Sequence, residues 1–179
     1  MLNKKAFTLV ELMIVVFIVS MGMVGVMSLI SQIFLYTHLN QSKLTGAYLA
    51  QEGIEIVRNI RDTNWLEGRT DNGTVTPGDE TDDWDYKIKG SGTDYTYAVQ
   101  YDTNSASIDY SPNSIDDPGA RLKINGFYSH GAVNPTFFYR LITVEKISND
   151  KLRVRCEVKW TEHAHSYQIV AEEHLYKWR

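Results

Sequence analysis

The segment from Leu12 to Tyr36 carries no formally charged residue, and it constrains the fold more than any other part of the chain. About 20 apolar residues cross a bilayer as an α-helix, so this run is long enough to span a membrane. Lys4 and Lys5 precede it, and short basic flanks of this kind stay in the cytoplasm. The carboxy-terminal part of the chain is therefore expected outside. The mean hydropathy of the whole chain is −0.29, so that part is expected to form a water-soluble domain.

The overall composition limits the kinds of function open to the chain. A formal net charge of −4 argues against nucleic acid as a partner. The sequence holds one cysteine, Cys156, so no internal disulfide can form and an extracytoplasmic domain must rely on packing. Cys156 falls on the apolar face of a predicted strand, which favours a buried thiol over a reactive one.

Glu11 is an acid at the start of this apolar segment. A charge near the bilayer centre costs roughly 2.5–3.5 kcal/mol on insertion scales, so an acid in such a place indicates a function. Two simpler interpretations leave it unexplained. A cleaved secretory signal would end near Ser20 or Gly22, but the apolar run continues beyond them. An uncleaved signal anchor explains only the length of the run and the lysines.

The stretch KKAFTLVELMIVV, residues 4 to 16, resembles the amino terminus of type IV pilins and type II secretion pseudopilins. In that family a short basic leader is cut just before a phenylalanine, which is followed by Thr-Leu, Val or Leu, Glu and an apolar helix. The resemblance implies that prepilin peptidase removes residues 1–6 by cutting between Ala6 and Phe7, and methylates the new amino group of Phe7. Glu11 then becomes the fifth residue of the mature chain, the position of the family's nearly invariant acid. Ala6 stands where the family usually has glycine.

The same resemblance implies a reason for the acid. Cleavage leaves a positively charged amine on Phe7 in an apolar setting, and in a filament Glu11 of one subunit can pair with the Phe7 amine of its neighbour. Removing one side of such a pair leaves a buried charge at a cost of several kcal/mol. Glu11 is thus interpreted as a filament-assembly residue. The implied partners are prepilin peptidase, other pilin or pseudopilin subunits, an inner-membrane assembly platform and the lipid bilayer.

Beyond Tyr36 the chain is expected to continue as an amphipathic helix. Apolar and small residues recur there in steps of three and four, which places them on one helix face: Leu35, Leu39, Ser42, Gly46, Leu49, Gly53, Ile56 and Ile60. The small members of this stripe allow very close packing, most simply against a sheet. The helix is predicted from Phe7 to about Arg61, with residues 12–36 in the membrane.

The remaining residues, 62–179, are expected to form a globular head packed on helix residues 39–61. Three carboxy-terminal segments have the composition and alternation of strands, and short polar turns separate them: FFYRLITVEKI, KLRVRCEVKW and SYQIVAEEHLYKW. With YTYAVQY, residues 95–101, they predict an antiparallel sheet of about four strands, while most of residues 62–120 are predicted as loops. A helix stripe that faces a one-sided sheet gives a two-layer α+β fold, and the pilin family has this arrangement.

Two clusters have the residue types of metal ligands. The loop Asp79–Asp85 holds five carboxylates, and calcium prefers oxygen ligands, but no spacing matches a known calcium loop. A solvated acidic loop is therefore favoured, and no cofactor is expected. His163, His165 and His174 could meet across the last hairpin, but no fourth zinc ligand stands at a convincing spacing, so surface histidines are favoured.

One strand carries a basic face made of Lys151, Arg153, Arg155 and Lys159. Such a face could contact DNA phosphates or an acidic neighbour. A charged strand face that deters edge pairing is favoured instead.

No nucleophile elbow, phosphate loop or metalloprotease helix occurs, so the chain is not expected to be an enzyme. The sequence predicts a pilin-like structural subunit in the inner membrane and then in a filament. Its size, lack of a disulfide and irregular loops favour a minor pilin or a pseudopilin. The alternative is an uncleaved, membrane-anchored extracytoplasmic binding domain with Trp65, Trp84 and Tyr128 as its ligand surface.

Overall fold

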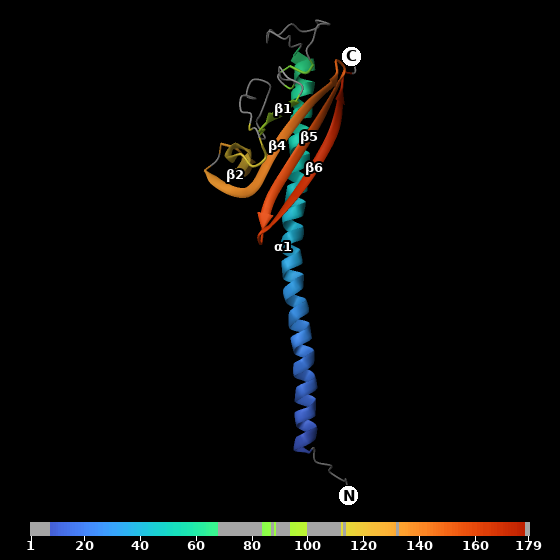
Figure 1. The fold of residues 1–179 in the computed structure, drawn as a ribbon, viewed down its shortest axis with the longest axis vertical. Coiled ribbons are helices and arrows are strands. Elements are labelled where there is room, and N and C mark those ends of the chain that lie inside the picture. Colours follow the sequence, from blue (N-terminus) through green and yellow to red (C-terminus); the bar gives the residue numbers. More distant parts are fainter. Residues whose placement is uncertain are drawn as a thin grey trace. The chain divides into compact units, whose positions relative to one another are not determined.

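The computed structural model describes residues 8–67, 84–86, 88, 94–99, 112, 114–131 and 133–177. The chain divides into two compact units, Met1–Ser42 and Lys43–Arg179, and helix α1 (Leu9–Glu67) contributes to both (Figure 1). In the second unit, residues of α1 pack against an antiparallel sheet. The expected α+β fold class is therefore confirmed.

Within the described residues the sheet contains six strands, where about four were expected. Five follow the order β3-β2-β4-β5-β6, and β1 pairs with β4 beside this path. The strands are β1 (Asp94–Tyr97), β2 (Arg121–Asn125), β3 (Phe127–Ser129), β4 (Asn134–Ser148), β5 (Lys151–Glu162) and β6 (His165–Tyr176), and one turn of 3-10 helix, Pro118–Ala120, precedes β2. All the strand pairs are antiparallel, and β4, β5 and β6 form the predicted meander.

The hairpin formed by β2 and β3 is not among the predicted strands. Its strands have only five and three residues, and alternation over so short a length is a weak indicator. Gly126 turns the chain with a φ of 80°, which glycine adopts without strain. The dipeptide Asn125-Gly126 is a sequence signal from which this turn could have been predicted. Strand β1 is shorter than predicted, since it ends at Tyr97, and Tyr101 lies outside the described residues.

Helix α1 ends at Glu67, beyond the predicted end near Arg61. The segment DTNWLE contains few strong helix formers, so local propensity favours an earlier end. Tertiary contacts explain the difference. The side-chain amide of Asn64 is fully buried and donates to the carbonyl oxygens of Trp84 at 3.3 Å and Tyr86 at 3.0 Å. These bonds hold the last turns of the helix against the segment 84–86.

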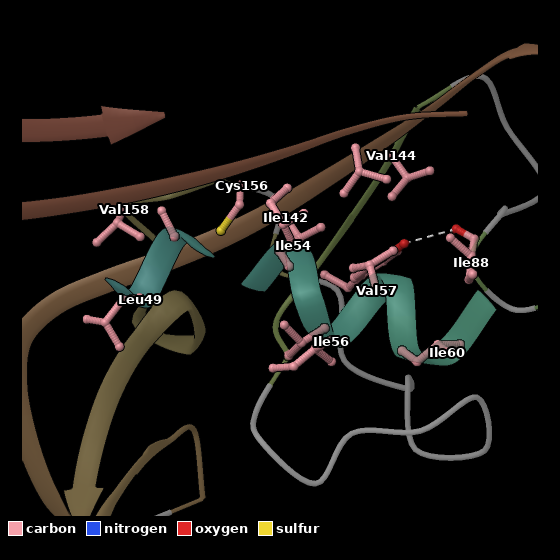
Figure 2. Close-up of a cluster of buried hydrophobic side chains, with 14 of the residues drawn as sticks. Leu49, Ile54, Ile56, Val57, Ile60, Ile88, Ile142, Val144, Cys156 and Val158 are labelled. Carbon is pink, nitrogen blue, oxygen red and sulfur yellow. Dashed lines mark hydrogen bonds between the residues drawn. The ribbon is translucent and has the colours of Figure 1, made fainter. Parts of the chain in front are cut away.

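The core of the second unit lies between α1 and the inner face of the sheet. Alternate residues of β5 are at most 1% exposed, as the predicted one-sided strand requires: Leu152, Val154, Cys156, Val158 and Trp160. Figure 2 shows Leu49, Val57 and Ile60 of the helix in the same cluster as Ile142 and Val144 of β4. The helix and the sheet therefore bury each other's apolar side chains, which is the main favourable term in folding.

The buried face of α1 follows the predicted stripe except at its beginning. Gly46, Gly53 and Ile60 are buried, together with the other predicted stripe residues after residue 45. Leu39 is only half-buried, and Leu35 is 51% exposed. Because its side chain is exposed, Leu35 is not part of the buried stripe, and that prediction was wrong.

Two glycines set the distance between α1 and the sheet. A Cβ atom added at Gly53 would lie 2.5 Å from Sγ of Cys156 and 3.2 Å from Cδ1 of Ile142. A Cβ atom added at Gly46 would lie 2.8 Å from Cζ3 of Trp160. Contacts this short do not occur without a shift of one partner, because protein interiors are close-packed. The expectation that small residues on the stripe allow close packing is therefore confirmed.

The inner face of β4 contains a charged residue that the apolar pattern does not explain. Arg140 is 0% exposed, and its guanidinium donates to the carbonyl oxygens of Leu49 at 3.1 Å and Val99 at 2.6 Å. The same group lies 3.4 Å from the carboxylate of Glu52. One buried cation thus connects α1, β4 and the residues that follow β1, and its hydrogen bonds offset much of the cost of its desolvation.

Gly53→Ala is expected to lower the unfolding free energy by about 1–3 kcal/mol, because the new methyl group overpacks the contact with Cys156. Better helix propensity, worth about 1 kcal/mol, offsets part of this cost. The measurement is denaturant unfolding of the full chain in detergent. Gly25→Ala is the matched control, because nothing lies within 4 Å of a Cβ atom there. Equal effects of the two substitutions would contradict the close approach.

Arg140→Met is expected to lower the unfolding free energy by about 2–4 kcal/mol, because buried carbonyl groups lose a charged donor. Arg153→Met is the control, since that guanidinium pairs with Glu145 at the surface and such pairs contribute under about 1 kcal/mol. The same denaturant titration compares the two. If Arg140→Met lowers the unfolding free energy no more than Arg153→Met does, the buried hydrogen bonds of Arg140 do not stabilise the fold.

Candidate functional site

The described part of the first unit is the first half of α1, and its apolar side chains are exposed. From Leu9 to Tyr36 the exposed fraction of the large apolar residues ranges from 41% at Ile30 to 74% at Leu9. Among the described residues, α1 is the one helix long and apolar enough to cross a membrane, with a mean hydropathy of 2.6 in its apolar part. Such side chains need surroundings that lipid or neighbouring helices can supply.

Two of the serine hydroxyl groups inside this apolar run are satisfied within the helix itself. Ser20 donates to the carbonyl oxygen of Phe17 at 2.8 Å, and Ser31 donates to that of Met27 at 3.0 Å. Backbone carbonyl groups one turn earlier accept such bonds without any partner from outside the helix. These polar side chains therefore do not need water or a second chain.

Helix α1 begins with Thr8 as its N-cap, three residues before Glu11. Thr8 precedes the first helical residue, and its hydroxyl oxygen accepts a hydrogen bond from the backbone N–H of Glu11 at 3.3 Å. The carbonyl oxygen of Thr8 accepts the N–H of Leu12 at 3.2 Å. Thr-x-x-Glu is the capping-box pattern, and an acid in the first turn also interacts favourably with the helix dipole. The stretch TLVE therefore already indicated a helix start at Thr8. The interpretation of Glu11 as an assembly residue does not use this signal.

The other residues of the predicted processing site lie outside the described residues. This applies to Ala6 and Phe7, and also to Lys4 and Lys5. Within the described part of the chain, the Glu11 carboxylate forms no ion pair. An unpaired acid among exposed apolar side chains is chemically suited to accept a cation from elsewhere.

The acidic loop is only partly described. Residues 79–83 lie outside the described residues, whereas Asp85 is 2% exposed and therefore not solvated as expected. Its carboxylate lies 3.7 Å from Nζ of Lys146, so a cation near this acid offsets its burial. No group of three His, Cys, Asp or Glu side chains in the described ranges could hold a metal ion.

The three histidines of the last hairpin do not come together. His163 lies in the turn between β5 and β6, and its carbonyl oxygen is 3.0 Å from Nδ1 of His165. His174 lies near the other end of β6, where it pairs in register with Arg153. The geometry thus gives these side chains no shared ligand position.

The basic face of β5 is neutralised by neighbouring acids. Three of its cations form ion pairs, Arg153 with Glu145, Arg155 with Glu157 and Lys159 with Asp116. Nζ of Lys151 lies 5.3 Å from the ring centre of Tyr176. A surface on which cations and acids alternate has little net attraction for a phosphate backbone. These pairs agree with a charged strand face rather than a nucleic-acid surface.

Trp65, Trp84 and Tyr128 do not form an exposed aromatic surface. Trp84 is 2% exposed, and its ring centre lies 6.2 Å from that of Trp65. Tyr128 is half-buried and meets the ring of Phe138 edge-on at 6.2 Å. These aromatic side chains therefore contribute to packing, and the ligand surface named for an uncleaved binding domain is not formed by them.

Cys156 is fully buried on the inner face of β5, as its position in the strand indicates. Burial raises the pKa of its thiol to about 12. The thiol therefore stays protonated and unreactive at neutral pH.

Together these observations describe an α+β protein with one apolar amino-terminal helix, which fits an inner-membrane anchor. Residues 1–27 match the family model of the prokaryotic N-terminal methylation motif, the signature of type IV pilins and pseudopilins. No curated protein and no solved structure gives a significant match to the chain. The motif supports a type IV pilin-like protein that prepilin peptidase processes, and the pilin family is structural rather than enzymatic.

His130 is a titratable residue that the sequence pattern did not single out. It is half-buried after β3. Burial, and next the positive charge of Arg140, lower the pKa of its imidazole to about 4. The ring is therefore neutral in the folded protein at neutral pH, and its protonation opposes folding.

Acid is expected to destabilise the second unit between about pH 6.5 and pH 4. In this range the unfolded chain, with an ordinary histidine pKa near 6.5, binds a proton that folded His130 does not bind. The contribution of His130 to this loss is about 1–3 kcal/mol. Unfolding free energy measured against pH should vary less in His130→Gln, whereas His165→Gln, at an exposed site, should behave as wild type. An unchanged pH dependence in His130→Gln would contradict this role.

Proposed function

We propose that this chain is a minor pilin or pseudopilin, a structural subunit of a type IV pilus-like filament. Prepilin peptidase cuts between Ala6 and Phe7 and methylates the amine of Phe7, and the mature chain is assembled through α1. The observation that carries the proposal is Glu11, an acid in the first turn of an exposed apolar helix, inside the stretch that matches the methylation motif.

The start of α1 supports an intermolecular partner for this acid. A cut before Phe7 would place a positive amine one residue ahead of the Thr8 cap, at the positive end of the helix dipole. The amine is then unfavourable where it stands unless an anion is near. Glu11 of one subunit pairs with the Phe7 amine of the next, so that assembly supplies each charge with the partner that a lone chain in lipid lacks.

The location follows from the same features. Lys4 and Lys5 hold the amino terminus in the cytoplasm, and the second unit lies outside before the subunit leaves the membrane for a filament. The membrane-spanning part is residues 12–36, as the exposure of their side chains supports. The absence of a second cysteine and the irregular connections favour a minor subunit.

Intact mass spectrometry of the membrane-extracted protein tests the processing step. The expected mass corresponds to loss of residues 1–6 and gain of one methyl group. A full-length chain would support an uncleaved anchor, and a cut near Gly22 would support ordinary secretion. Either of these two results would overturn the proposal.

Two substitutions at Glu11 separate its role in assembly from its role in capping. Glutamine also completes a capping box, so Glu11→Gln keeps the helix start but removes the charge. Both Glu11→Gln and Glu11→Leu are expected to be processed yet depleted from filaments, because the neighbour's amine loses a partner at a cost of about 3–5 kcal/mol.

The readout is the fraction of processed subunit in sheared filaments, measured by immunoblot. Ser20→Leu is the matched control, because that hydroxyl is already satisfied by the carbonyl of Phe17. Normal incorporation of Glu11→Gln together with loss of Glu11→Leu would assign the acid to capping alone and count against charge pairing.

A further inference from the structure

Strand β6 is the end strand of the sheet (Figure 1), and in the described part of the chain no strand pairs with its outer edge. Its other edge pairs with β5 over the whole length of the strand, without a register shift. A long, regular edge is a template for a further strand, so natural proteins interrupt or cover such edges. Common forms of protection are missing here, because β6 contains no proline, no lysine and no bulge.

The register of β5 and β6 identifies the backbone groups that face the open edge. The N–H of Lys177 donates to the carbonyl oxygen of Asp150 at 2.9 Å, and this pair continues the register of the two strands. Hydrogen-bonded and non-hydrogen-bonded pairs alternate along an antiparallel ladder. The N–H and C=O groups of Ser166, Gln168 and Val170 therefore point away from β5, toward the open edge.

The inner face of β6 is less completely buried than that of β5. The inner residues of β5 are at most 1% exposed, whereas Tyr167, Ile169 and Ala171 of β6 contact the core but are only partly buried. A groove of about 360 Å³ lies beside Ile169 and Ala171, and α1 contributes small or apolar side chains to it: Ala47, Ala50 and Ile54. The apolar core is thus open along this edge, and an added strand would cover it.

A cluster of ion pairs closes one end of this groove. Glu173 lies on the inner face of β6, and its carboxylate accepts a hydrogen bond from the guanidinium of Arg58 at 2.6 Å. Arg58 also pairs with Glu55, so these three charges satisfy one another. Inward-pointing charges are one means by which proteins prevent strand addition. The part of β6 that is suited to a partner is therefore residues 166–172.

The charge of this stretch indicates the sign of the partner. Glu172 is exposed, and within the described residues its carboxylate forms no ion pair. Its register neighbour on β5, Arg155, pairs with Glu157 instead. On an added strand the residue directly opposite Glu172 would have its Cβ atom about 4.5–5.5 Å away, a separation at which opposite charges attract. A basic residue is therefore favoured at that position.

We propose that residues 166–172 of β6 receive an extended segment of a different protein as a further strand of the sheet. The outward backbone groups of β6 bond to this segment. Its inward side chains are small and apolar and cover the groove, and a lysine or arginine lies opposite Glu172. In this mode of recognition the backbone bonds supply affinity, and the side-chain contacts supply specificity.

A partner of different sequence, rather than a second copy, agrees with the proposed role as a minor subunit. We identify the partner as another subunit of the same filament, and this identification rests on the proposed function. The binding edge itself does not, because it follows from the register, burial and charge of β6 alone.

Amide hydrogen exchange of the full chain in detergent tests the edge with a defined probe. The probe is a blocked peptide, Lys-Ala-Thr-Val-Thr-Ala-Lys, in millimolar excess, which alternates small apolar residues with polar ones. It is expected to slow exchange of the Gln168 and Val170 amides about tenfold and to leave the His174 amide unchanged, because His174 lies beyond Glu173. The same peptide N-methylated at both threonines keeps its side chains but lacks the donors, so it should protect neither amide.

Photo-cross-linking in cells identifies the natural occupant. A photoreactive phenylalanine analogue in place of Val170, whose side chain is exposed, should cross-link to a segment of another filament subunit that has the proposed alternation. Adding Gln168→Pro should remove most of this product, because proline lacks the outward N–H yet is tolerated on an edge strand. His174→Pro is the matched control, since it removes an outward N–H beyond the docking stretch and should leave the product unchanged.

The outcomes separate this contact from the filament function. Processed chains in filaments with neither amide protection nor a cross-link would overturn the contact and leave the pilin function standing. A cross-link to this chain itself or to a second copy would overturn the proposed partner, and a product that survives Gln168→Pro would overturn strand addition. Unprocessed chains without filaments would overturn the function and the identity of the partner, but amide protection by the peptide would still support the edge.

Discussion

Close contact between α1 and the inner face of the sheet is the constraint on which the second unit depends. Gly46 and Gly53 have no side chains, so Trp160 and Cys156 occupy the space beside the helix backbone. The same closeness lets Arg140 of β4 reach a helix carbonyl group. Larger residues on this stripe would hold the sheet away from the helix, open the core to water and leave that guanidinium buried without its partners. The small residues are therefore as important to this core as the bulky ones.

Long periodic patterns were sufficient to predict the helix and the meander, but short or tertiary features were not. Alternation in β5 placed its inner residues correctly because ten successive positions alternate between the inner and the outer face. The same alternation puts Arg140 on the inner face of β4, yet its charge predicts an exposed side chain. The buried carbonyl group of Val99 that accepts its hydrogen bond is distant in sequence and cannot be predicted from a local pattern. Asp85 was misplaced for the same reason, since the nearby Lys146 is distant in sequence. The hairpin at Gly126 needed its turn dipeptide rather than strand periodicity to be found.

The candidate site, too, could be predicted only where it depends on a contiguous stretch of sequence. The sequence alone indicates the processing motif and the acid, because both are contiguous patterns. The structure adds that the backbone N–H of Glu11 donates to the hydroxyl oxygen of Thr8, which caps the start of the helix. Its carboxylate is different, because the cation proposed for it belongs to another chain. No pattern within one chain can give the position of that cation, since it arises only in the assembly.

The polar groups of the apolar segment differ in whether they need a partner from another subunit. Ser20, Ser31 and Thr37 all bond to carbonyl groups of their own helix, so lipid imposes little cost on them. Glu11 differs from these hydroxyl groups, because a helix carbonyl group cannot donate to a carboxylate, and within the described residues its carboxylate forms no ion pair. Charge pairing at that point would admit any neighbouring helix that brings an amine.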